Sequence, residues 1–221
     1  VLTFNAWNSS FSADRAAAAV LSSGADVVAL QELDAVRTVF PRISAVYPYH
    51  TPCDAPQDCS VVVFSRRPII SADHINLAGD SLGPMHLKDQ GDVQLARLTF
   101  IAPDGKPATL VTTHLRWPIP PRPYRRQQDV LAAFLARQPL DRLILTGDFN
   151  LPPSTFAMRR QVAAFRPDLV LYQSGVDGLE GDRLGRMSLS LDGLARRDAR
   201  VYALAKRLGV PIVATLGGGY G

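Results

Sequence analysis

The sequence has few cysteines, few histidines and no long hydrophobic run. Its 221 residues include two cysteines and four histidines. No apolar segment is long enough to cross a bilayer, so we expect no transmembrane segment in this chain. Turn-forming residues separate Cys53 from Cys59, and the pair either closes a small loop as a disulfide in an oxidising compartment or remains as two free thiols. With a single cysteine pair, no structural zinc site is predicted there.

Charge of one sign is not concentrated in the sequence either. The formal net charge is +4 and the sequence pI is about 9.3. This mild excess is compatible with a phosphate-bearing substrate but is far from that of a dedicated DNA-binding surface. The hydrophobic content of 47% is ordinary for a globular chain, and the length suits one full domain. Because the chain begins at Val1 inside an expected strand, we expect the natural N-terminus, with any signal peptide, to lie upstream.

Expected strands and helices alternate along the chain, which predicts an α/β or α+β fold. Apolar runs and their flanking turn residues place strands at residues 2–7, 26–31, 60–65, 95–101, 108–113 and 143–148, and helices at 14–23 and 125–138. Residues 73–92 are polar and contain glycine, so we expect a long loop there. Four prolines predict a second irregular loop at residues 117–123.

The most informative segment is the expected strand that ends at residues 146–150. Strand alternation puts Asp148 and Asn150 on one face, with Phe149 turned away from them. Gly147 allows the backbone to approach a neighbour closely. A carboxylate beside an amide at a strand end suits a hard cation and the phosphate oxygens that it binds. The alternative is an ordinary turn, since Gly-Asp ends many strands.

Polar residues end three further expected strands, in the segments Thr3-Phe4-Asn5, Leu30-Gln31-Glu32 and Thr112-Thr113-His114-Leu115. In this order, and with the strand of residues 60–66, the four strand ends resemble the endonuclease/exonuclease/phosphatase superfamily over about residues 1–165. The resemblance implies a DNase I-like sandwich of two sheets flanked by helices. It also implies metal-dependent hydrolysis of phosphoester bonds, with phosphodiesters expected, in nucleic acid, a nucleotide or a phospholipid head group.

The same resemblance implies a role for each polar residue. Glu32 would be the principal ligand of Mg²⁺ (or Mn²⁺), and Asn5 would help to hold the metal site. Asp148 would orient or activate the attacking water, while Asn150 and His114 would bind the scissile phosphate. Arg116 follows His114 closely, and its charge suggests a further phosphate contact.

Each of these residues also has a purely structural explanation when it is taken alone. Glu32 would then be a solvated strand end, and His114 a strand histidine with ordinary partners. Asp73 and His74 look like a second catalytic pair, but they lie in the expected loop of residues 73–92, and we expect them to have no catalytic role.

One part of the family pattern is missing. The resemblance implies an Asp-His pair on the last core strand, yet no histidine follows Asn150. We therefore expect a sandwich that is incomplete at its C-terminus and an activity that is impaired. A non-catalytic domain that binds phosphate or a partner is the alternative.

Residues 166–221 have a different character. An expected strand, a helix and a second strand resemble the C-terminal part of the histone deacetylase-like family, in which the residue matching Asp177 binds zinc and the residue matching Tyr220 polarises the acyl carbonyl. The other zinc ligands and the histidine dyad of that family are absent, so a unit that extends or caps a sheet is the preferred interpretation. The change near Phe165-Arg166 indicates a composite chain, for which a natural fusion, a mis-joined reading frame and a designed sequence are alternatives.

Overall fold

The computed structural model describes residues 1–6, 13–53, 59–77, 93–115, 121–139, 141–150, 159, 162, 165–182 and 188–217. The chain divides into two compact units, Val1–Asn150 and Leu151–Gly221, which are described separately below. The boundary predicted from the sequence, between residues 165 and 166, stays a prediction.

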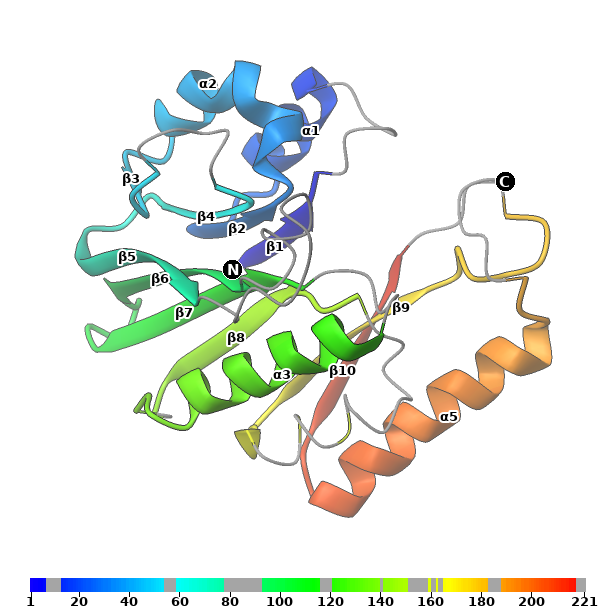
Figure 1. Cartoon of the computed structure of the whole chain (residues 1–221). Coiled ribbons are helices and arrows are strands. Elements are labelled where there is room, and N and C mark those ends of the chain that lie inside the picture. The colour runs from blue at the N-terminus through cyan, green and yellow to red at the C-terminus, as the bar shows by residue number, and fades with distance from the viewer. Residues whose placement is uncertain are drawn as a thin grey trace. The chain divides into compact units, whose positions relative to one another are not determined.

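The first unit contains two four-stranded sheets (Figure 1). The first sheet has the order β1-β2-β4-β3, with strands β1 (Leu2–Asn5), β2 (Val27–Gln31), β3 (Tyr49–His50) and β4 (Val61–Ser65). The second has the order β5-β6-β7-β8, with strands β5 (Ile69–Leu77), β6 (Val93–Ile101), β7 (Pro107–His114) and β8 (Leu143–Asp148). Each sheet contains one parallel pair, β1 with β2 and β7 with β8, while its other pairs are antiparallel.

Strand β2 shows how the sequence produces a layered sandwich. All five of its residues are buried, because alternate side chains enter two different cores. Val27 and Ala29 pack with apolar residues of the second sheet. Val28 and Leu30 face the opposite way, into a core made with the helices. The predicted DNase I-like two-sheet fold is therefore present in this unit.

Three helical segments pack on the outer face of the first sheet (Figure 1). They are α1 (Ala13–Ser22), the 3-10 helix η1 (Leu33–Val39) and α2 (Phe40–Ser44). Their buried side chains include Val20, Val36 and Ile43, which share a core with the even-numbered residues of β2. The predicted helix at 14–23 is thus confirmed to within one residue at each end.

Two loop predictions were partly wrong. Helix α3 (Pro121–Leu135) begins inside the segment that its prolines were expected to keep irregular. The first backbone N–H groups of a helix have no intrahelical acceptor, so Pro121 and Pro123 cost no hydrogen bond there. Strand β5 likewise continues to Leu77, into the expected loop of residues 73–92, because it pairs with β6 along its length.

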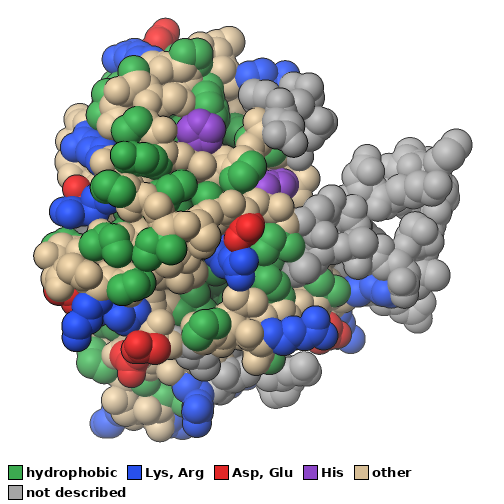
Figure 2. All heavy atoms as spheres, turned by 90° about the vertical axis from the view of Figure 1, so that its left-hand side faces the viewer, with side chains coloured by type: hydrophobic (Ala, Val, Ile, Leu, Met, Phe, Trp, Pro, Cys, Tyr) green, Lys and Arg blue, Asp and Glu red, His purple; other side chains and the backbone are tan. Residues whose placement is uncertain are grey.

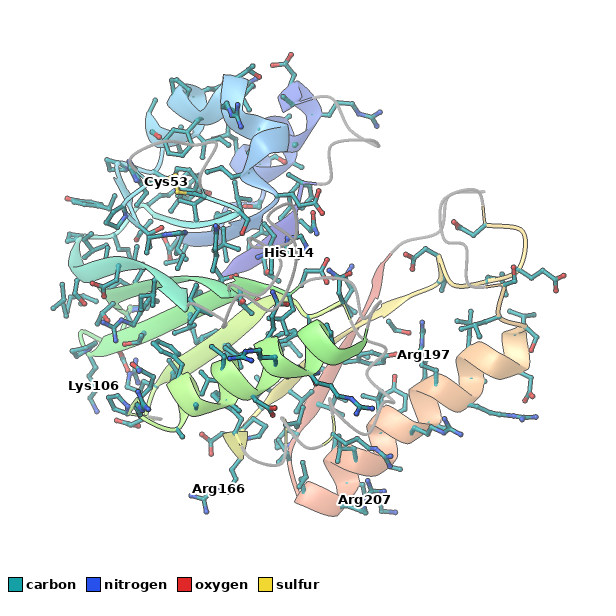
Figure 3. The ribbon with its side chains drawn as sticks, in the orientation of Figure 1. Cys53, Lys106, His114, Arg166, Arg197 and Arg207 are labelled. Atoms are coloured by element: carbon teal, nitrogen blue, oxygen red, sulfur yellow. A yellow bond between two sulfur atoms is a disulfide. The ribbon has the colours of Figure 1, made fainter. Side chains whose placement is uncertain are left out.

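Cys53 and Cys59 are joined by a disulfide, with 6.1 Å between their Cα atoms (Figure 3). Cys59 is buried, and Cys53 packs against the same core as the helices. Of the two predicted alternatives, the small closed loop is the one found. No helix of the described residues combines the length and apolarity needed to cross a membrane.

The second unit is a strand–helix–strand motif. It consists of β9 (Val170–Gly175), α5 (Leu191–Leu208) and β10 (Ile212–Gly217). The two strands are parallel, with Ile212 paired to Val170. Ser190 caps the helix by accepting a hydrogen bond from the backbone N–H of Gly193, and Gly209 ends it in the left-handed conformation.

A polar cluster connects β9 to α5. The Asp198 carboxylate accepts hydrogen bonds from Tyr172 Oη at 2.6 Å and from Ser174 Oγ at 3.0 Å. Arg197 donates to Asp198 Oδ1 at 2.8 Å and to the Gly175 carbonyl at 2.6 Å (Figure 3). Burial raises the pKa of Tyr172 to about 12, and its bond to Asp198 adds to the rise. Burial also acts to raise the pKa of Asp198, but the hydrogen bonds from Tyr172, Arg197 and Ser174 outweigh it and lower that pKa.

The lowered pKa predicts a stability that depends on pH. Because Asp198 binds its proton less tightly when folded, its contribution is complete above the ordinary carboxyl pKa of 3.8 and is lost as the pH falls through the lower folded value. Asp198→Asn should cost about 1–3 kcal/mol near pH 6. Urea unfolding of both proteins at a series of pH values should show this difference shrinking below pH ~4. A difference that does not depend on pH would contradict the assignment.

Candidate active site

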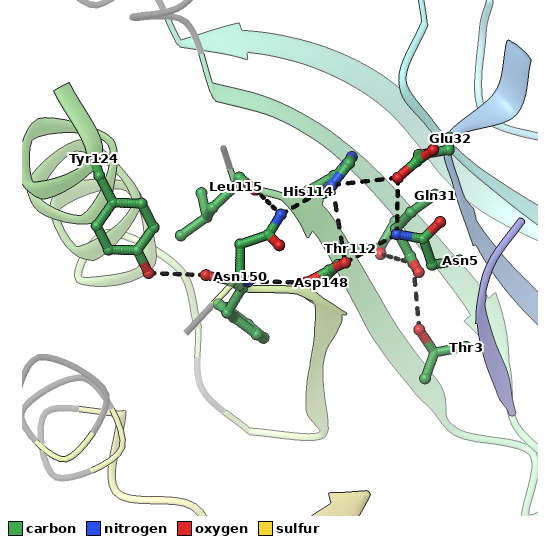
Figure 4. Close-up of polar contacts among 11 residues, drawn as sticks. Thr3, Asn5, Gln31, Glu32, Thr112, His114, Leu115, Tyr124, Asp148 and Asn150 are labelled. Atoms are coloured by element: carbon green, nitrogen blue, oxygen red, sulfur yellow. Dashed lines mark hydrogen bonds and ion pairs between the residues drawn. The ribbon is translucent and has the colours of Figure 1, made fainter. Parts of the chain in front are cut away.

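The two parallel strand pairs place their carboxyl ends at the same edge of the sandwich. Asn5 ends β1, and Glu32 directly follows β2. His114 ends β7 and is paired with Asp148, the last residue of β8. Four residues from four separated segments of the sequence therefore meet at one site (Figure 4).

Asn5 connects the two carboxylates of this site. Its Nδ2 donates to Glu32 Oε1 at 3.2 Å and to Asp148 Oδ2 at 2.9 Å (Figure 4). The first acceptor belongs to the same sheet as Asn5, and the second belongs to the other sheet. A single amide group thus holds carboxylate oxygens from both sheets close together.

His114 lies against the same two carboxylate oxygens. Its Nε2 is 3.9 Å from Glu32 Oε1 and 3.9 Å from Asp148 Oδ2, and only 19% of its side chain is exposed. The same nitrogen is 3.2 Å from Asn150 Nδ2, which also donates to the Leu115 carbonyl at 2.6 Å. With Asn150 in this orientation, Nε2 accepts the amide proton, so the ring proton of the neutral imidazole is on Nδ1.

Backbone geometry fixes both acidic residues. Asp148 Oδ1 accepts a hydrogen bond from the Asn150 backbone N–H at 2.8 Å, which closes a turn at the strand end. Asn150 has φ 47°, a left-handed conformation that asparagine tolerates. Glu32 has φ 56° and ψ 55°, which is uncommon for a glutamate. Such a conformation costs of order 1–2 kcal/mol and persists only where the surrounding structure imposes it.

Gly147 is required by the close approach of β8 to β7. It has φ 136°, and a Cβ atom at this position would overlap the backbone carbonyl of Thr113, its partner on β7. The close approach predicted from the sequence for this glycine is therefore found. Because Gly147 directly precedes Asp148, the glycine also sets where that carboxylate lies.

Helix α3 supports the same strand end from another side, which the sequence analysis missed. Tyr124 Oη donates to the carbonyl of Phe149 at 2.8 Å and accepts a hydrogen bond from Gln128 at 3.0 Å. Burial raises the pKa of Tyr124 well above its ordinary range, so the phenol stays a donor. No signal in the sequence pointed to this contact, because the helix was expected to begin after Tyr124.

The donor set fits a hard divalent cation. Two carboxylates converge on one amide, and such convergence of like charges favours a cation between them. Mg²⁺ typically binds through one or two carboxylates together with waters and substrate phosphates. Among the described residues, no group of three His, Cys, Asp or Glu residues is placed to hold a metal ion, so a closed all-protein metal cage is not formed within them.

Other predicted residues lie elsewhere or outside the described residues. Arg116 and Tyr220 belong to segments that the structure does not describe. Asp177 lies half-buried in a turn after β9. The apparent Asp73-His74 pair is on β5, where the Asp73 carboxylate accepts two hydrogen bonds from Arg97, at 2.7 and 3.0 Å. Asp73 therefore has a structural ion pair, in agreement with the expectation that it has no catalytic role.

A family model described as "Endonuclease/Exonuclease/phosphatase family" matches residues 2–201 of this chain. The chain belongs to this family. The match spans Asn5, Glu32, His114, Asp148 and Asn150, and it continues past the predicted junction at Phe165-Arg166. The predicted superfamily is thereby confirmed.

Solved structures of similar fold include sphingomyelinase C from Streptomyces griseocarneus, with a TM-score of 0.59 and 22% identity over 79% of this chain and 72% of that one. Another is TDP2 from D. rerio, solved as a complex with a single-strand DNA product, with a TM-score of 0.50 and 20% identity over 74% of this chain and 63% of that one. At these identities the likeness shows the DNase I-like fold alone.

Two curated proteins match a short part of the chain. Histone deacetylase 2 of Arabidopsis thaliana is 43% identical over 56 residues, and an uncharacterized protein of Picosynechococcus is 44% identical over 55 residues. Each match covers 25% of this chain but only 14% and 18%, respectively, of the relative's length. These short matches give weak support to the predicted deacetylase-like segment. They are no evidence of an activity for this chain.

The close approach at Gly147 gives a sharp test of how the site is built. Gly147→Ala should lower the free energy of unfolding by at least ~2 kcal/mol, because it adds a steric overlap to an unfavourable backbone conformation. Gly105 is the matched control, since it also has a positive φ (78°) but nothing within 4 Å of an added Cβ. Gly105→Ala should cost about 1 kcal/mol. Equal losses for the two variants in urea unfolding would contradict the close approach.

Proposed function

We propose that this chain hydrolyses phosphoester bonds, and specifically phosphodiesters, with Mg²⁺ or Mn²⁺ bound at the edge of the sandwich. The observation that carries this proposal is the convergence of Glu32, Asp148, Asn5 and His114 on one another from two sheets. An ordinary strand end has no reason to collect two carboxylates, an amide and an imidazole around a shared point. Membership of the family supports the same class of reaction.

The residues divide naturally between metal and phosphate. Glu32 and Asn5 would hold the cation, with Asn5 turning its carbonyl oxygen inward. When bound, the cation neutralises charge that develops on the phosphoryl oxygens. His114 and Asn150 lie on the other side of the carboxylates, where they would donate to the non-bridging oxygens.

Asp148 is best placed to act on water. Its Oδ1 is fixed by the Asn150 backbone N–H, so its orientation does not need to change during the reaction. A carboxylate held in this way can orient an attacking water and accept its proton. The sequence has no histidine after His114, so the histidine of the family's final Asp-His pair is missing from this chain. We therefore propose slow turnover.

The substrate class follows from the same chemistry. A phosphodiester in nucleic acid, in a nucleotide or in a phospholipid head group offers the two non-bridging oxygens that this site would bind. The modest net charge of +4 does not select among these. On the face of the molecule drawn in Figure 2, acidic and basic side chains are interspersed among the coloured residues, without a large patch of one sign.

Binding without turnover is the second candidate. The missing histidine favours it. The described site has the residues proposed to bind a cation and a phosphate, but only one imidazole. Calorimetry with Mg²⁺ and a nucleotide distinguishes the two proposals, since this one requires binding with no product formed.

A deacetylase site is not proposed for the second unit. A catalytic zinc ion takes three protein ligands, and no group of three candidate ligands occurs among the described residues. The unit is instead proposed to extend or cap a sheet. The Cys53–Cys59 disulfide supports an extracytoplasmic, oxidising location.

The proposed activity can be measured with bis(p-nitrophenyl) phosphate as a generic phosphodiester. Turnover should require Mg²⁺ or Mn²⁺ and stop when a chelator is added. Glu32→Gln and Asp148→Asn should each lower kcat/KM by about 10²–10⁴-fold, because each removes a charge that the transition state needs.

Asp104→Asn is the matched control. It removes a carboxylate from the turn between β6 and β7, at the opposite end of the second sheet, where Asp104 pairs with Arg142 at 2.9 Å. Its activity should equal that of the unchanged protein. Turnover that persists in the chelator, or an equal effect of all three substitutions, would refute the proposed site.

A further inference from the structure

The candidate site draws its residues from both sheets. Asn5 ends β1 and Glu32 follows β2 of the first sheet, whereas His114 and Asp148 end β7 and β8 of the second and Asn150 follows β8. The distances within the site therefore depend on how one sheet lies on the other. Most of that interface is apolar and includes Val63 and Leu98, and apolar packing is non-directional.

Gln31 is a polar residue within this interface. It follows four buried apolar residues on β2, directly precedes Glu32, and is only 2% exposed. Its Nε2 donates to Thr112 Oγ1 on β7 at 2.9 Å, a bond between the two sheets with both groups buried (Figure 4). The same nitrogen lies 3.2 Å from Thr3 Oγ1 on β1. Thr112 precedes His114 by two residues, so the bond lies directly beneath the site.

We propose that Gln31 is a positioning residue that fixes the relative position of the two packed sheets through its hydrogen bond to Thr112. It thereby sets the spacing between Glu32 and the His114–Asp148 pair. The effect on turnover rests on the function proposed above. The geometry itself does not, because a buried directional hydrogen bond selects one arrangement where apolar contacts allow several.

A second link limits what the loss of Gln31 does to the fold. Just before β4, Ser60 donates through its backbone N–H and its hydroxyl to Gln94 Oε1 on β6, at 2.6 and 2.8 Å. The two sheets therefore remain joined through Ser60 and Gln94 when the Gln31–Thr112 hydrogen bond is removed. We expect a displacement of the site rather than unfolding.

Replacing both partners separates positioning from stability. Thr112→Val alone removes the acceptor of Gln31 on the second sheet and leaves its contacts with Thr3 and Ala29 of the first sheet, which should destabilise the protein. The double variant Gln31→Met/Thr112→Val replaces both groups by apolar ones of similar shape, so its thermal midpoint should return to within about 3 °C of the unchanged protein. Thr112→Ser keeps the hydroxyl and should restore the arrangement.

If Gln31 positions the site, the double variant stays defective although it is stable. Its kcat should fall about 10–100-fold, as expected for misplacement by around an ångström, with KM little changed. Its Kd for Mn²⁺, measured by calorimetry, should rise about 10-fold, as for other groups that orient metal ligands. Thr112→Ser, which keeps the hydroxyl, should have the kcat and the Mn²⁺ Kd of the unsubstituted protein. If Gln31 only stabilises the fold, activity and Mn²⁺ affinity recover together with the thermal midpoint in the double variant, and the proposal is wrong.

The NMR signals of the Asn5 side-chain amide should depend on the relative position of the two sheets, and they can be measured without metal or substrate. Its NH₂ group bonds to Glu32 in its own sheet and to Asp148 in the other, so its NMR signals should shift in the double variant and return in Thr112→Ser. Thr109→Val is the control, because it removes a hydroxyl that bonds Thr99 at the far end of β7. It should leave these signals unchanged. Unchanged Asn5 signals in the double variant would overturn the positioning role even if the unchanged protein proves to be inactive.

Discussion

The site depends on the face-to-face contact of two sheets. Neither sheet contains the candidate active site alone, because the first supplies an amide and a carboxylate and the second supplies an imidazole, a carboxylate and another amide. The apolar cluster between the sheets, which includes Val27, Val61 and Leu110, provides most of the adhesion. Directional groups at one edge then turn this adhesion into a defined geometry. The parallel pairing within each sheet determines that the polar residues emerge at that edge.

Much of this arrangement was predictable from local patterns. Apolar strands that end in Asn5, Glu32, His114 and Asp148 were predicted from the sequence, and the carboxyl ends of parallel neighbours necessarily share an edge. Gly147 was predicted for the same reason, because a glycine before a functional carboxylate signals a close backbone approach. These inferences need only the period of a strand and the order of motifs.

The remaining features depend on contacts between segments that are distant in the sequence. The hydrogen bond from Tyr124 to the Phe149 carbonyl joins residues 25 apart, and that from Gln31 to Thr112 joins residues 81 apart. Gln31 did carry a signal, since it is a polar residue at the end of an otherwise apolar buried strand. Helix α3 was predicted to begin too late because proline was taken as a helix breaker at positions where the first turn tolerates it. Strand β5 was not predicted at all, because a polar residue such as Asp73 finds its partner, Arg97, only through the pairing with β6.

The left-handed backbone of Glu32 has a consequence for any attempt to stabilise this protein. Glycine or asparagine would adopt φ 56° with less strain, and neither would place a carboxylate among the groups around Asn5. A library selected only for heat resistance would therefore enrich replacements at this position and discard the chemistry with them. Directed evolution of this chain needs a selection for both activity and stability, because the two favour different residues at this position.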